Sequence, residues 1–585
     1  MTNRNHCLAS TLLALALAPG AFAGELTSRM ELSLERVRQG GPPVYSDDFV
    51  LADAVPQHVR RFTEFSGDVS GRYLGALATV AQFSGQEFPE LDRVAAKLLP
   101  LQKADGHFGD PFTTEAVANS DMALLWGNGR LLIGLLEYYR LRPNPEVLAC
   151  ARRLGDCFVK LGPRFIDPAI LEKFSGDQVA VGYICWTQII EGLVALNRAT
   201  QDDKYLRLAE QIAANTHRYP KEHSHGFVSA LRGVLELHRV THDEKWLKKV
   251  ETEWEGIIAS GNMLPQGALP EIFKPMIARD EGCAEADWLR LNLDLWAETH
   301  NPRYLDNAEL TLFNEFFFNQ FHTGDFGHHD LSDEGIGDWS ARAWWCCTLH
   351  GLRAFPEIFR AAFHSESARL CYDLPVDGRG AVAGLVVQAD STLAQDARAT
   401  LRVTEADRAE HTLGVRQPIW ASRLELTLNG QALAGVAQAG TVEVRRRWQS
   451  GDQVTVHYVL RTRLRPHPED ASRVAILRGP WFLGVNVQNA PTYFDEPPEN
   501  ARVLLPALDV AGDLPLKSTV DVVAGPVRFA APAAYLALPY RPGGYPIQPQ
   551  TVLLRPIAEH TAVADATRWA LWFRPEKAQD LARQP

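Results

Sequence analysis

Cysteine is scarce in this chain of 585 residues, which contains only eight. Proteins built on a disulfide framework carry a much higher density of paired cysteines, so this sequence excludes that class. Basic residues are also fewer than acidic ones, and the formal net charge is −12. A mildly acidic surface argues against nucleic acid as a partner. Four cysteines in apolar runs are interpreted as small buried hydrophobic residues: Cys150, Cys157, Cys185 and Cys371.

Long hydrophobic runs are absent as well, since no stretch reaches the roughly 20 residues that a membrane-spanning helix requires. The longest candidate is the short run Leu8–Ala18, which follows Arg4 and precedes the small-x-small segment Ala21–Ala23. These features together predict a signal peptide with cleavage near Ala23. A membrane anchor is the alternative, but the run is short for that role. We therefore expect a periplasmic or secreted protein without membrane insertion.

Residues from about 60 to 365 have the composition and periodicity of helices. An aromatic residue followed by leucine recurs at the start of amphipathic segments, as Tyr205-Leu206, Trp246-Leu247 and Tyr304-Leu305. Repeated helix pairs cannot bury their apolar faces alone, so they must stack or close into a ring. The leucines at alternate positions of 289–295 would also fit a strand, but the repeat that follows favours a buried helix.

After about residue 370 the sequence changes to short runs in which valine and threonine alternate with polar residues. Leu424–Leu428 and Gln453–Val459 are examples, and Asn429-Gly430 is a hairpin turn signal after the first. This pattern predicts an all-β, sandwich-like region. The predicted organisation is a signal peptide, a helical domain and a β region of one or two units, at residues 1–23, 24–365 and 366–585.

The most informative cysteines are the adjacent pair Cys346 and Cys347, together with Cys283, which lies two residues after Glu281. Three thiols and a carboxylate suit Zn²⁺, which binds thiolate sulfur and carboxylate oxygen in a tetrahedral shell. Adjacent side chains diverge on a regular helix or strand, so we expect a bent loop at the cysteine pair. A disulfide within the pair, or buried thiols without a metal, are the alternatives.

Several polar residues near this cluster are candidates for catalysis or sugar binding. Glu271 follows the loop signal Gly267–Pro270, and a loop carboxylate on the face of the cluster can act as a proton donor, with Glu334 as the alternative. Either group is equally interpretable as a solvated surface residue. Candidates for hydrogen bonding to, or stacking on, a sugar are His223, His225, His328 and Trp345, for which helix-start and core roles are the alternatives.

Motifs from most of the chain form a set that resembles a known family. In the helical region they are Glu281–Trp296, Tyr304–Glu309 with Asn314, and Cys346–Gly351. In the β region they are Arg416–Trp420, Leu428–Gly430, Arg447–Asp452 and Arg478–Pro480. The set resembles glycoside hydrolase family 127, the β-L-arabinofuranosidase-type enzymes.

This resemblance implies a mainly α protein, with an (α/α)₆-barrel catalytic domain followed by β-sandwich domains. It implies an exported, zinc-dependent retaining glycosidase acting on terminal glycan residues, with Cys346 as nucleophile and Glu271 as acid/base. The implied zinc ligands are Glu281, Cys283, Cys346 and Cys347. Well-known members have two prolines after the cysteine pair, whereas this chain has Thr348-Leu349. The departure indicates a divergent branch and leaves the identity of the sugar open.

Two other functions remain open from the sequence. The first is a barrel enzyme that uses a pair of carboxylates, either an ordinary glycosidase or a lyase on acidic sugars, with purely structural thiols. The second is a non-catalytic glycan-binding relative, because a fold does not fix a function. The expected partner is a glycan or oligosaccharide in each case.

Overall fold

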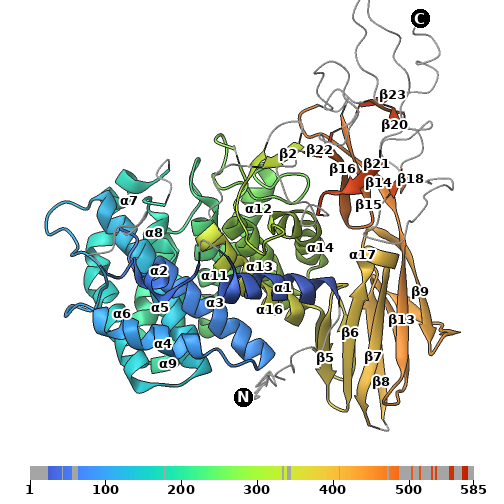
Figure 1. Cartoon of the computed structure of the whole chain (residues 1–585), viewed down its shortest axis with the longest axis horizontal. Coiled ribbons are helices and arrows are strands. Elements are labelled where there is room, and N and C mark those ends of the chain that lie inside the picture. Colours follow the sequence, from blue (N-terminus) through green and yellow to red (C-terminus); the bar gives the residue numbers. More distant parts are fainter. Residues whose placement is uncertain are drawn as a thin grey trace, which may run out of the picture.

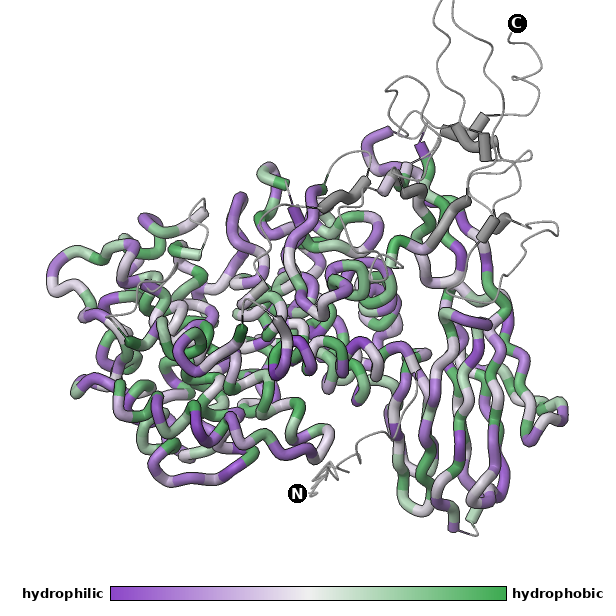
Figure 2. Tube along the Cα trace, viewed as in Figure 1, coloured by the Kyte–Doolittle hydropathy of each residue, from purple (hydrophilic) through white to green (hydrophobic). Residues whose placement is uncertain are grey.

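The computed structural model of the chain places a helical domain beside a β-sheet region (Figure 1). It describes residues 24–41, 44–55, 64–176, 180–277, 279–331, 335–338, 344–407, 409–470, 473–486 and short segments between 502 and 576. The predicted signal peptide and Glu334 lie outside the described residues. Hydrophobic and hydrophilic positions are interspersed along both regions (Figure 2). Within the described ranges, no helix is long and apolar enough to span a bilayer.

In the described part of the chain, six helices pack side by side in a closed ring, with the last returning to the first. They are α3 (Asp68–Ser84), α5 (Asn119–Leu141), α9 (Ile190–Thr200), α11 (Ser224–Thr241), α13 (Gly282–Thr299) and α16 (Trp344–Ala361). Successive inner helices are linked through outer helices α4 (Pro89–Leu98), α6 (Pro145–Phe165), α10 (Asp203–Asn215), α12 (Glu244–Ala259) and α14 (Pro302–Thr311). This arrangement is the α/α barrel that the sequence predicts, and the alternating leucines lie on helix α13.

Shorter helices and an N-terminal helix complete this domain. Helix α1 (Glu25–Gln39) packs against α16. The remaining segments are α2 (Asp47–Leu51), η1 (Leu99–Leu101), α7 (Pro168–Phe174), α8 (Ile184–Thr187), the π-helical turn η2 (Leu312–Phe316) and α15 (Phe317–Asn319).

The recurring aromatic-leucine pattern marks the start of three outer helices, α10, α12 and α14. Three residues before each aromatic side chain, Asp202, Asp243 or Asn301 accepts a hydrogen bond from the backbone N–H two residues further on. Such caps satisfy donors that the first helical turn leaves free. The aromatic residue then falls on the buried face of the helix, which orients that helix against the inner ring.

Helices α3 and α5 approach each other through glycines. A Cβ atom on Gly71 would lie 2.5 Å from the carbonyl oxygen of Arg130, and one on Gly134 would lie 2.1 Å from that of Gly71. Only glycine permits this backbone contact. The close packing brings the side chains of Arg72 and Arg130 together inside the ring.

The β region begins directly after α16 and contains two sheets that share a buried core. One has the order β10-β9-β13-β7-β6-β5 and the other β11-β12-β8-β4-β3. Their strands are β3 (Phe363–Glu366), β4 (Arg369–Tyr372), β5 (Gly378–Val382), β6 (Leu385–Thr392), β7 (Arg398–Ala406), β8 (Glu410–Arg416), β9 (Ala421–Leu428), β10 (Gln431–Ala432), β11 (Val436–Gln438), β12 (Thr441–Arg447) and β13 (Gln453–Leu460), with helix α17 (Leu393–Asp396) between β6 and β7. Asn429 and Gly430 form the predicted two-residue turn, both with positive φ.

Two further sheets contain the later strands. The larger includes β1 (His329–Leu331), β2 (Gly335–Asp338), β14 (Thr462–Pro466), β15 (Val474–Arg478), β16 (Trp481–Asn486), β18 (Asp513–Leu514), β19 (Phe529–Ala530), β21 (Leu553–Pro556) and β22 (Trp569–Ala570). The smaller contains β20 (Ala534–Tyr535), β17 (Arg502–Leu504) and β23 (Arg574–Glu576). Because β1 and β2 come from the helical half, this larger sheet joins the two regions.

A buried ion pair also fastens the sandwich to the barrel. The guanidinium of Arg416, at the end of β8, donates to Glu309 at 2.8 Å and to Asp306 at 2.5 Å, both on α14. The indole of Trp420 donates to the same Glu309 carboxylate at 3.1 Å. The arginine and tryptophan of the segment Arg416–Trp420 therefore have an interdomain structural role.

Several charged side chains on α9, α11 and α16 are paired with one another inside the barrel. Arg353 on α16 donates to Glu191 on α9 at 2.9 Å, and Arg232 on α11 lies 3.9 Å from the same carboxylate. Burial opposes the ionisation of Glu191, but the charges of Arg353, Arg232 and Arg290 lower its pKa to about 2 from an ordinary value of 4.5. The carboxylate therefore stays charged and contributes to the packing of three inner helices.

We expect Glu191→Gln to lower the free energy of unfolding by about 3 kcal/mol at pH 7, because a buried arginine loses its charged partner. The folded-state pKa lies below the unfolded one, so this stabilisation is present above pH 4.5 and is lost as the pH falls towards 2. Urea unfolding should show nearly the same difference from wild type at pH 7 and pH 5 and a smaller one at pH 3.5. A difference that is constant with pH, or a similar one for the surface control Glu244→Gln, would contradict the assignment.

Candidate active site

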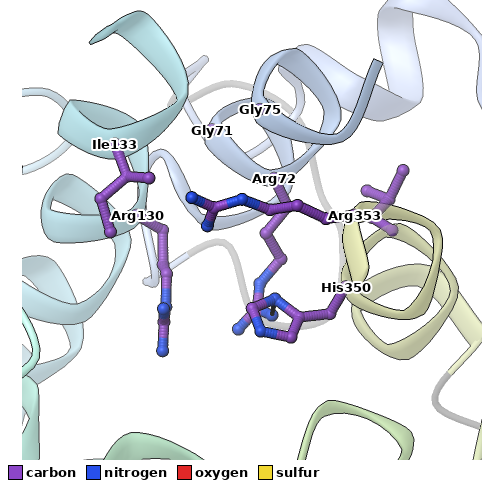
Figure 3. A pocket seen from close by; sticks show the side chains of 8 residues that line it. Gly71, Arg72, Gly75, Arg130, Ile133, His350 and Arg353 are labelled. Carbon is purple, nitrogen blue, oxygen red and sulfur yellow. Dashed lines mark hydrogen bonds between the residues drawn. The ribbon is translucent and has the colours of Figure 1, made fainter. Parts of the chain in front are cut away.

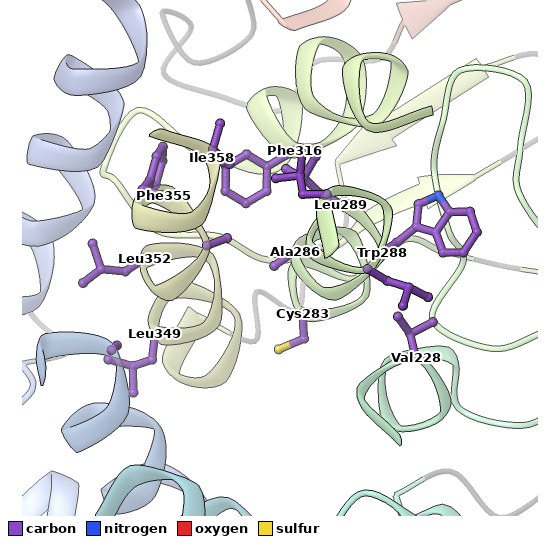
Figure 4. Close-up of a cluster of buried hydrophobic side chains, with 14 of the residues drawn as sticks. Val228, Cys283, Ala286, Trp288, Leu289, Phe316, Leu349, Leu352, Phe355 and Ile358 are labelled. Atoms are coloured by element: carbon purple, nitrogen blue, oxygen red, sulfur yellow. The ribbon is translucent and has the colours of Figure 1, made fainter. Parts of the chain in front are cut away.

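Four side chains converge where the amino ends of α13 and α16 meet. The donor atoms of Glu281, Cys283, Cys346 and Cys347 all lie within 4.8 Å of one another. The sulfur of Cys347 is 3.7 Å from that of Cys283 and 3.9 Å from that of Cys346. All seven cysteines of the described residues are free thiols, so the cysteine pair forms no disulfide in this structure. Figure 4 shows Cys283 projecting from α13 on the side that faces α16.

The expectation of a bent loop at the cysteine pair is wrong, because Cys346 and Cys347 occupy the first turn of α16. Adjacent side chains on a helix point about 100° apart. Both sulfurs nevertheless lie close to Cys283, because α13 and α16 pack side by side with their first turns next to each other. The four isolated cysteines of the sequence prediction are buried, as expected.

Gly282 makes this meeting of helix ends possible. It lies between two members of the cluster, at the first position of α13. A Cβ atom there would lie 2.6 Å from Oδ1 of Asn319 and 3.1 Å from Cβ of Cys347. Any larger residue would push α13 away from α16 and separate Cys283 from Cys347.

The three thiols differ in access and in acidity. Cys283 and Cys347 are fully buried, whereas Cys346 is only half-buried. Hydrogen bonds from the other two thiols, together with the positive charge of Arg72, hold the pKa of Cys346 well below its usual range despite burial. The amino ends of helices also carry partial positive charge, which favours thiolates. Cys346 is thus the most acidic of the three thiols, and the one that a ligand can reach.

Arg72 on α3 braces the cluster from the barrel interior. Its Nε donates to Asp68 at 2.8 Å, and its Nη1 donates to the sulfur of Cys283 at 3.5 Å. The same Nη1 lies 3.2 Å from Nδ1 of His350, and Nη2 lies 3.2 Å from Nε2 of His225. Figure 3 shows Arg72, Arg130 and His350 around the same cavity, which is also lined by Arg353. The guanidinium thus contacts a thiol, a carboxylate and two imidazoles.

These contacts fix the tautomers of both histidines. A guanidinium donates hydrogen bonds and cannot accept them, so Nδ1 of His350 and Nε2 of His225 must be unprotonated. The protons are therefore on the other ring nitrogens, which face Asp287 at 2.8 Å from His350 and 2.9 Å from His225. The second contact is close but not aligned as a hydrogen bond. Burial first, and then nearby arginines, lower the pKa of both rings, so both are neutral.

Glu271 lies beside the cluster, with an oxygen within 4.8 Å of both Glu281 and His223. Arg279 binds its carboxylate with two donors, one of them at 2.8 Å, and Nε2 of His328 is 3.6 Å away. Burial opposes ionisation, but His328 and Arg279 lower the pKa of Glu271 to about 2. In this arrangement Glu271 is a carboxylate, which is the form that a general base requires.

The candidate sugar-binding residues occupy different positions. Nε2 of His223 contacts Glu281 at 3.0 Å. His328 is buried, and neither ring nitrogen has a hydrogen-bond partner among the described residues. Trp345 is half-buried and precedes the cysteine pair. His225 is fully buried behind the cluster between arginines and Asp287, so it holds the site together and does not face a substrate.

Sequence reasoning missed the residues that support the cluster from inside the barrel. Arg72 and Arg130 each stand alone in an apolar, glycine-rich helix, in the segments Val69–Ala76 and Trp126–Leu136. A charged residue that must be buried needs a partner, so its presence there is a signal of a functional interior. The sequence contained no such signal for Asp287, because the two histidines that it contacts, His225 and His350, are distant from it in sequence.

An α/α barrel with a thiol and carboxylate cluster at the amino ends of its inner helices matches one class of carbohydrate-active enzyme. The sequence profile described as β-L-arabinofuranosidase, GH127 catalytic domain matches residues 50–359, and the GH127 middle-domain profile matches residues 376–460. The chain therefore belongs to the GH127 family, and it is a glycoside hydrolase. No curated protein matches the sequence.

Solved structures agree in fold. A GH127 β-L-arabinofuranosidase from Geobacillus stearothermophilus T6 is 17% identical with a TM-score of 0.69, over 95% of this chain and 99% of that chain. A second GH127 β-arabinofuranosidase is 17% identical with a TM-score of 0.70, over 94% of both chains. A protein described as a glycoside hydrolase is 16% identical with a TM-score of 0.61, over 88% of this chain and 94% of that chain. At these identities the likeness shows the fold.

Proposed function

We propose that this enzyme is a zinc-dependent, retaining glycosidase of the β-L-arabinofuranosidase type, with Cys346 as nucleophile. The observation that supports it is the cluster of three thiols and a carboxylate within 4.8 Å, in which Cys346 is the accessible thiol. Thiolate sulfur and carboxylate oxygen form a donor set that suits zinc. The residues that would hold the ion are Glu281, Cys283, Cys346 and Cys347, and a bound zinc would keep the sulfurs deprotonated at neutral pH.

Cys346 and Glu271 divide the chemistry between them. In the first step the sulfur of Cys346 forms a bond to the anomeric carbon, the glycosidic C–O bond breaks, and the departing oxygen takes a proton from Glu271. In the second step a water oxygen attacks the anomeric carbon, the C–S bond breaks, and Glu271 takes a proton from the water. Two displacements at one carbon retain its configuration.

Glu271 must gain a proton before the first step, although Arg279 keeps it ionised in this structure. A substrate that enters beside Glu281 and excludes water would disfavour the charged carboxylate, because desolvation raises the pKa of an acid. Arg279 is on the same short loop and is partly exposed, so its contact with Glu271 can loosen when a sugar binds. Arg279 would then set how readily Glu271 becomes protonated.

The substrate class follows from the same surroundings. The ring of His328, which makes no aligned hydrogen bond although its Nε2 lies 3.6 Å from Glu271, and the half-buried indole of Trp345 suit the hydroxyls and apolar face of a sugar ring. His223 would orient Glu281 and present its ring edge to the same space. We propose terminal residues of a glycan as substrate, with an L-arabinofuranoside as the first sugar to test because the matching profile describes that activity.

We also propose that residues 1–23 direct export and are then removed, on the sequence pattern described above. Protein recovered from a periplasmic or secreted fraction should begin near Gly24 when its amino terminus is sequenced. Material from such a fraction that still begins at Met1 would refute cleavage, and confinement to the cytoplasm would refute export.

Cys346→Ser should lower turnover of an aryl β-L-arabinofuranoside by more than about 10³-fold, as expected when a nucleophile is removed. Elemental analysis should still find most of the zinc, at about one ion per chain in the wild type, because three other ligands remain. Cys283→Ser should lose more of the zinc than Cys346→Ser, because Cys283 is fully buried and water cannot readily take its place. The control Cys371→Ala, on β4, should change neither property.

The configuration of the first-formed product gives an independent measurement. Proton NMR during turnover should show the anomeric configuration retained. An inverted product, or substantial activity in Cys346→Ser, would exclude the cysteine mechanism and favour an enzyme that uses a pair of carboxylates. Zinc content unchanged in a Cys283→Ser, Cys347→Ser double variant would exclude the metal site separately.

Glu271→Gln should slow hydrolysis of substrates with poor leaving groups by about 10²–10⁴-fold, the usual contribution of general acid–base catalysis. Aryl glycosides with activated leaving groups need less protonation, so their first step should be affected much less. The measurement is kcat/KM across a series of leaving groups. An equal, small loss throughout the series would assign the proton transfer to another residue, with Glu334 as the next candidate.

A further inference from the structure

Three more carboxylates meet near the start of α13. The side chains of Asp280, Glu285 and Glu315 are all 0% exposed, and their donor oxygens lie within 4.8 Å of one another. Asp280 directly precedes α13, Glu285 lies in its first turn, and Glu315 belongs to the π-helical turn η2. Neither Cys346 nor Glu271 belongs to this group, so the proposed catalytic chemistry does not account for it.

The hydrogen bonds of these groups leave several oxygens without a partner. Asp280 accepts from the backbone N–H of His329 at 2.5 Å and from Asn319 at 3.1 Å. One oxygen of Glu285 accepts from the backbone N–H of Leu269 at 2.8 Å, and the other has no partner. Neither oxygen of Glu315 has a partner within the described ranges. Buried polar atoms are normally satisfied, so three unpaired carboxyl oxygens at one point indicate that something else binds there.

Little positive charge from the described residues offsets this group. Among the described residues, no lysine or arginine forms an ion pair with Asp280, Glu285 or Glu315. Within the part of the chain that the structure describes, His329 is the basic side chain paired with them, through Asp280 at 3.1 Å. Three carboxylates this close together and away from water repel one another strongly. The arrangement therefore calls for a cation or for protons.

We propose that Asp280, Glu285 and Glu315 form a second metal site, which binds a hard divalent cation of the size of calcium. The donor set contains only oxygen, which calcium, magnesium and manganese prefer, whereas zinc prefers the sulfur-rich cluster. Calcium accepts several protein oxygens in a flexible geometry, whereas magnesium usually keeps several waters, so three fully buried carboxylates favour calcium.

The site would brace the segment that carries the thiol cluster. Glu281 and Cys283 lie between Asp280 and Glu285 in the sequence, so an ion bound to the two flanking carboxylates fixes the backbone of both. Glu315 ties that segment to η2, which follows outer helix α14. The ion is therefore structural, and the proposal does not depend on the proposed glycosidase mechanism.

Metal content and thermal unfolding of the full chain test the proposal. After dialysis into calcium-free buffer and back into 1 mM CaCl2, the wild type should hold about one calcium per chain in addition to zinc. Calcium should raise the unfolding midpoint by about 5 °C, as expected for a ligand that binds only the folded state. MgCl2 and MnCl2 at the same concentration are the comparison arms, and magnesium should give the smaller shift.

Glu315→Gln keeps the shape of the side chain and removes its charge. This variant should lose both the calcium and the calcium-dependent shift while its zinc content stays unchanged, and the surface control Glu244→Gln should behave as wild type. A calcium shift that persists in Glu315→Gln would place the ion elsewhere. If Glu315→Gln does not fold, Glu285→Gln and the wild-type calcium content decide the question.

The rival outcome is that protons, not a metal, neutralise these carboxyls. In that case the wild type would bind none of the three cations beyond its zinc, and Glu315→Gln would be at least as stable as wild type because its amide replaces a neutral acid. Either result overturns the proposal. Neither result bears on Cys346, whose tests use turnover and product configuration.

Discussion

Burying the guanidinium of Arg72 in the barrel constrains the whole site around it. Each of its donors must find an acceptor, because an unsatisfied buried charge is costly. One acceptor is the sulfur of Cys283, and two are imidazole nitrogens whose tautomers are thereby fixed. Asp287 then binds the opposite nitrogens of both rings. A single buried cation on α3 thus determines the state of groups on α11, α13 and α16.

The direction of the inner helices explains why the site is at one end of the barrel. The inner helices all begin at the same end of the barrel, because an outer helix carries the chain back between one inner helix and the next. Their amino ends, with free N–H groups and partial positive charge, therefore face one another across the axis. Thiolates and carboxylates are stabilised at this end, and Cys283, Cys346 and Cys347 all lie in the first turns of their helices.

The sequence allowed much of this fold and part of this site to be predicted, for identifiable reasons. Outer helices α10, α12 and α14 were recognisable because each begins with a cap and a buried aromatic residue at fixed spacing, and the β region because its alternation and Asn429-Gly430 turn are local signals. Glu281 and Cys283 were found as neighbours in sequence. The helical position of the cysteine pair was not predicted. The bent loop was inferred from the directions of adjacent side chains within one helix or strand, without the neighbouring helix. Nothing local reveals that two helix ends meet there. The Arg72 network and the acidic group joining Glu285 to Glu315 likewise depend on contacts between helices.

Charge balance connects these observations to the proposed metal. Arg130 is buried, and among the described residues no carboxylate lies within ion-pair distance of it. Burial, and then the nearby charge of Arg72, lower the pKa of Arg130 to about 10, so it is still a cation at neutral pH. Three thiolates and a carboxylate around a divalent ion leave a net charge of about −2. Arg72 is already paired with Asp68. Arg130 has no such ion pair among the described residues, so its positive charge would balance that of the proposed metal cluster. The positive charges of Arg72 and Arg130 would suit the proposed anionic metal cluster, while the carboxylates of Asp287, Asp68 and Glu191 also act on Arg130.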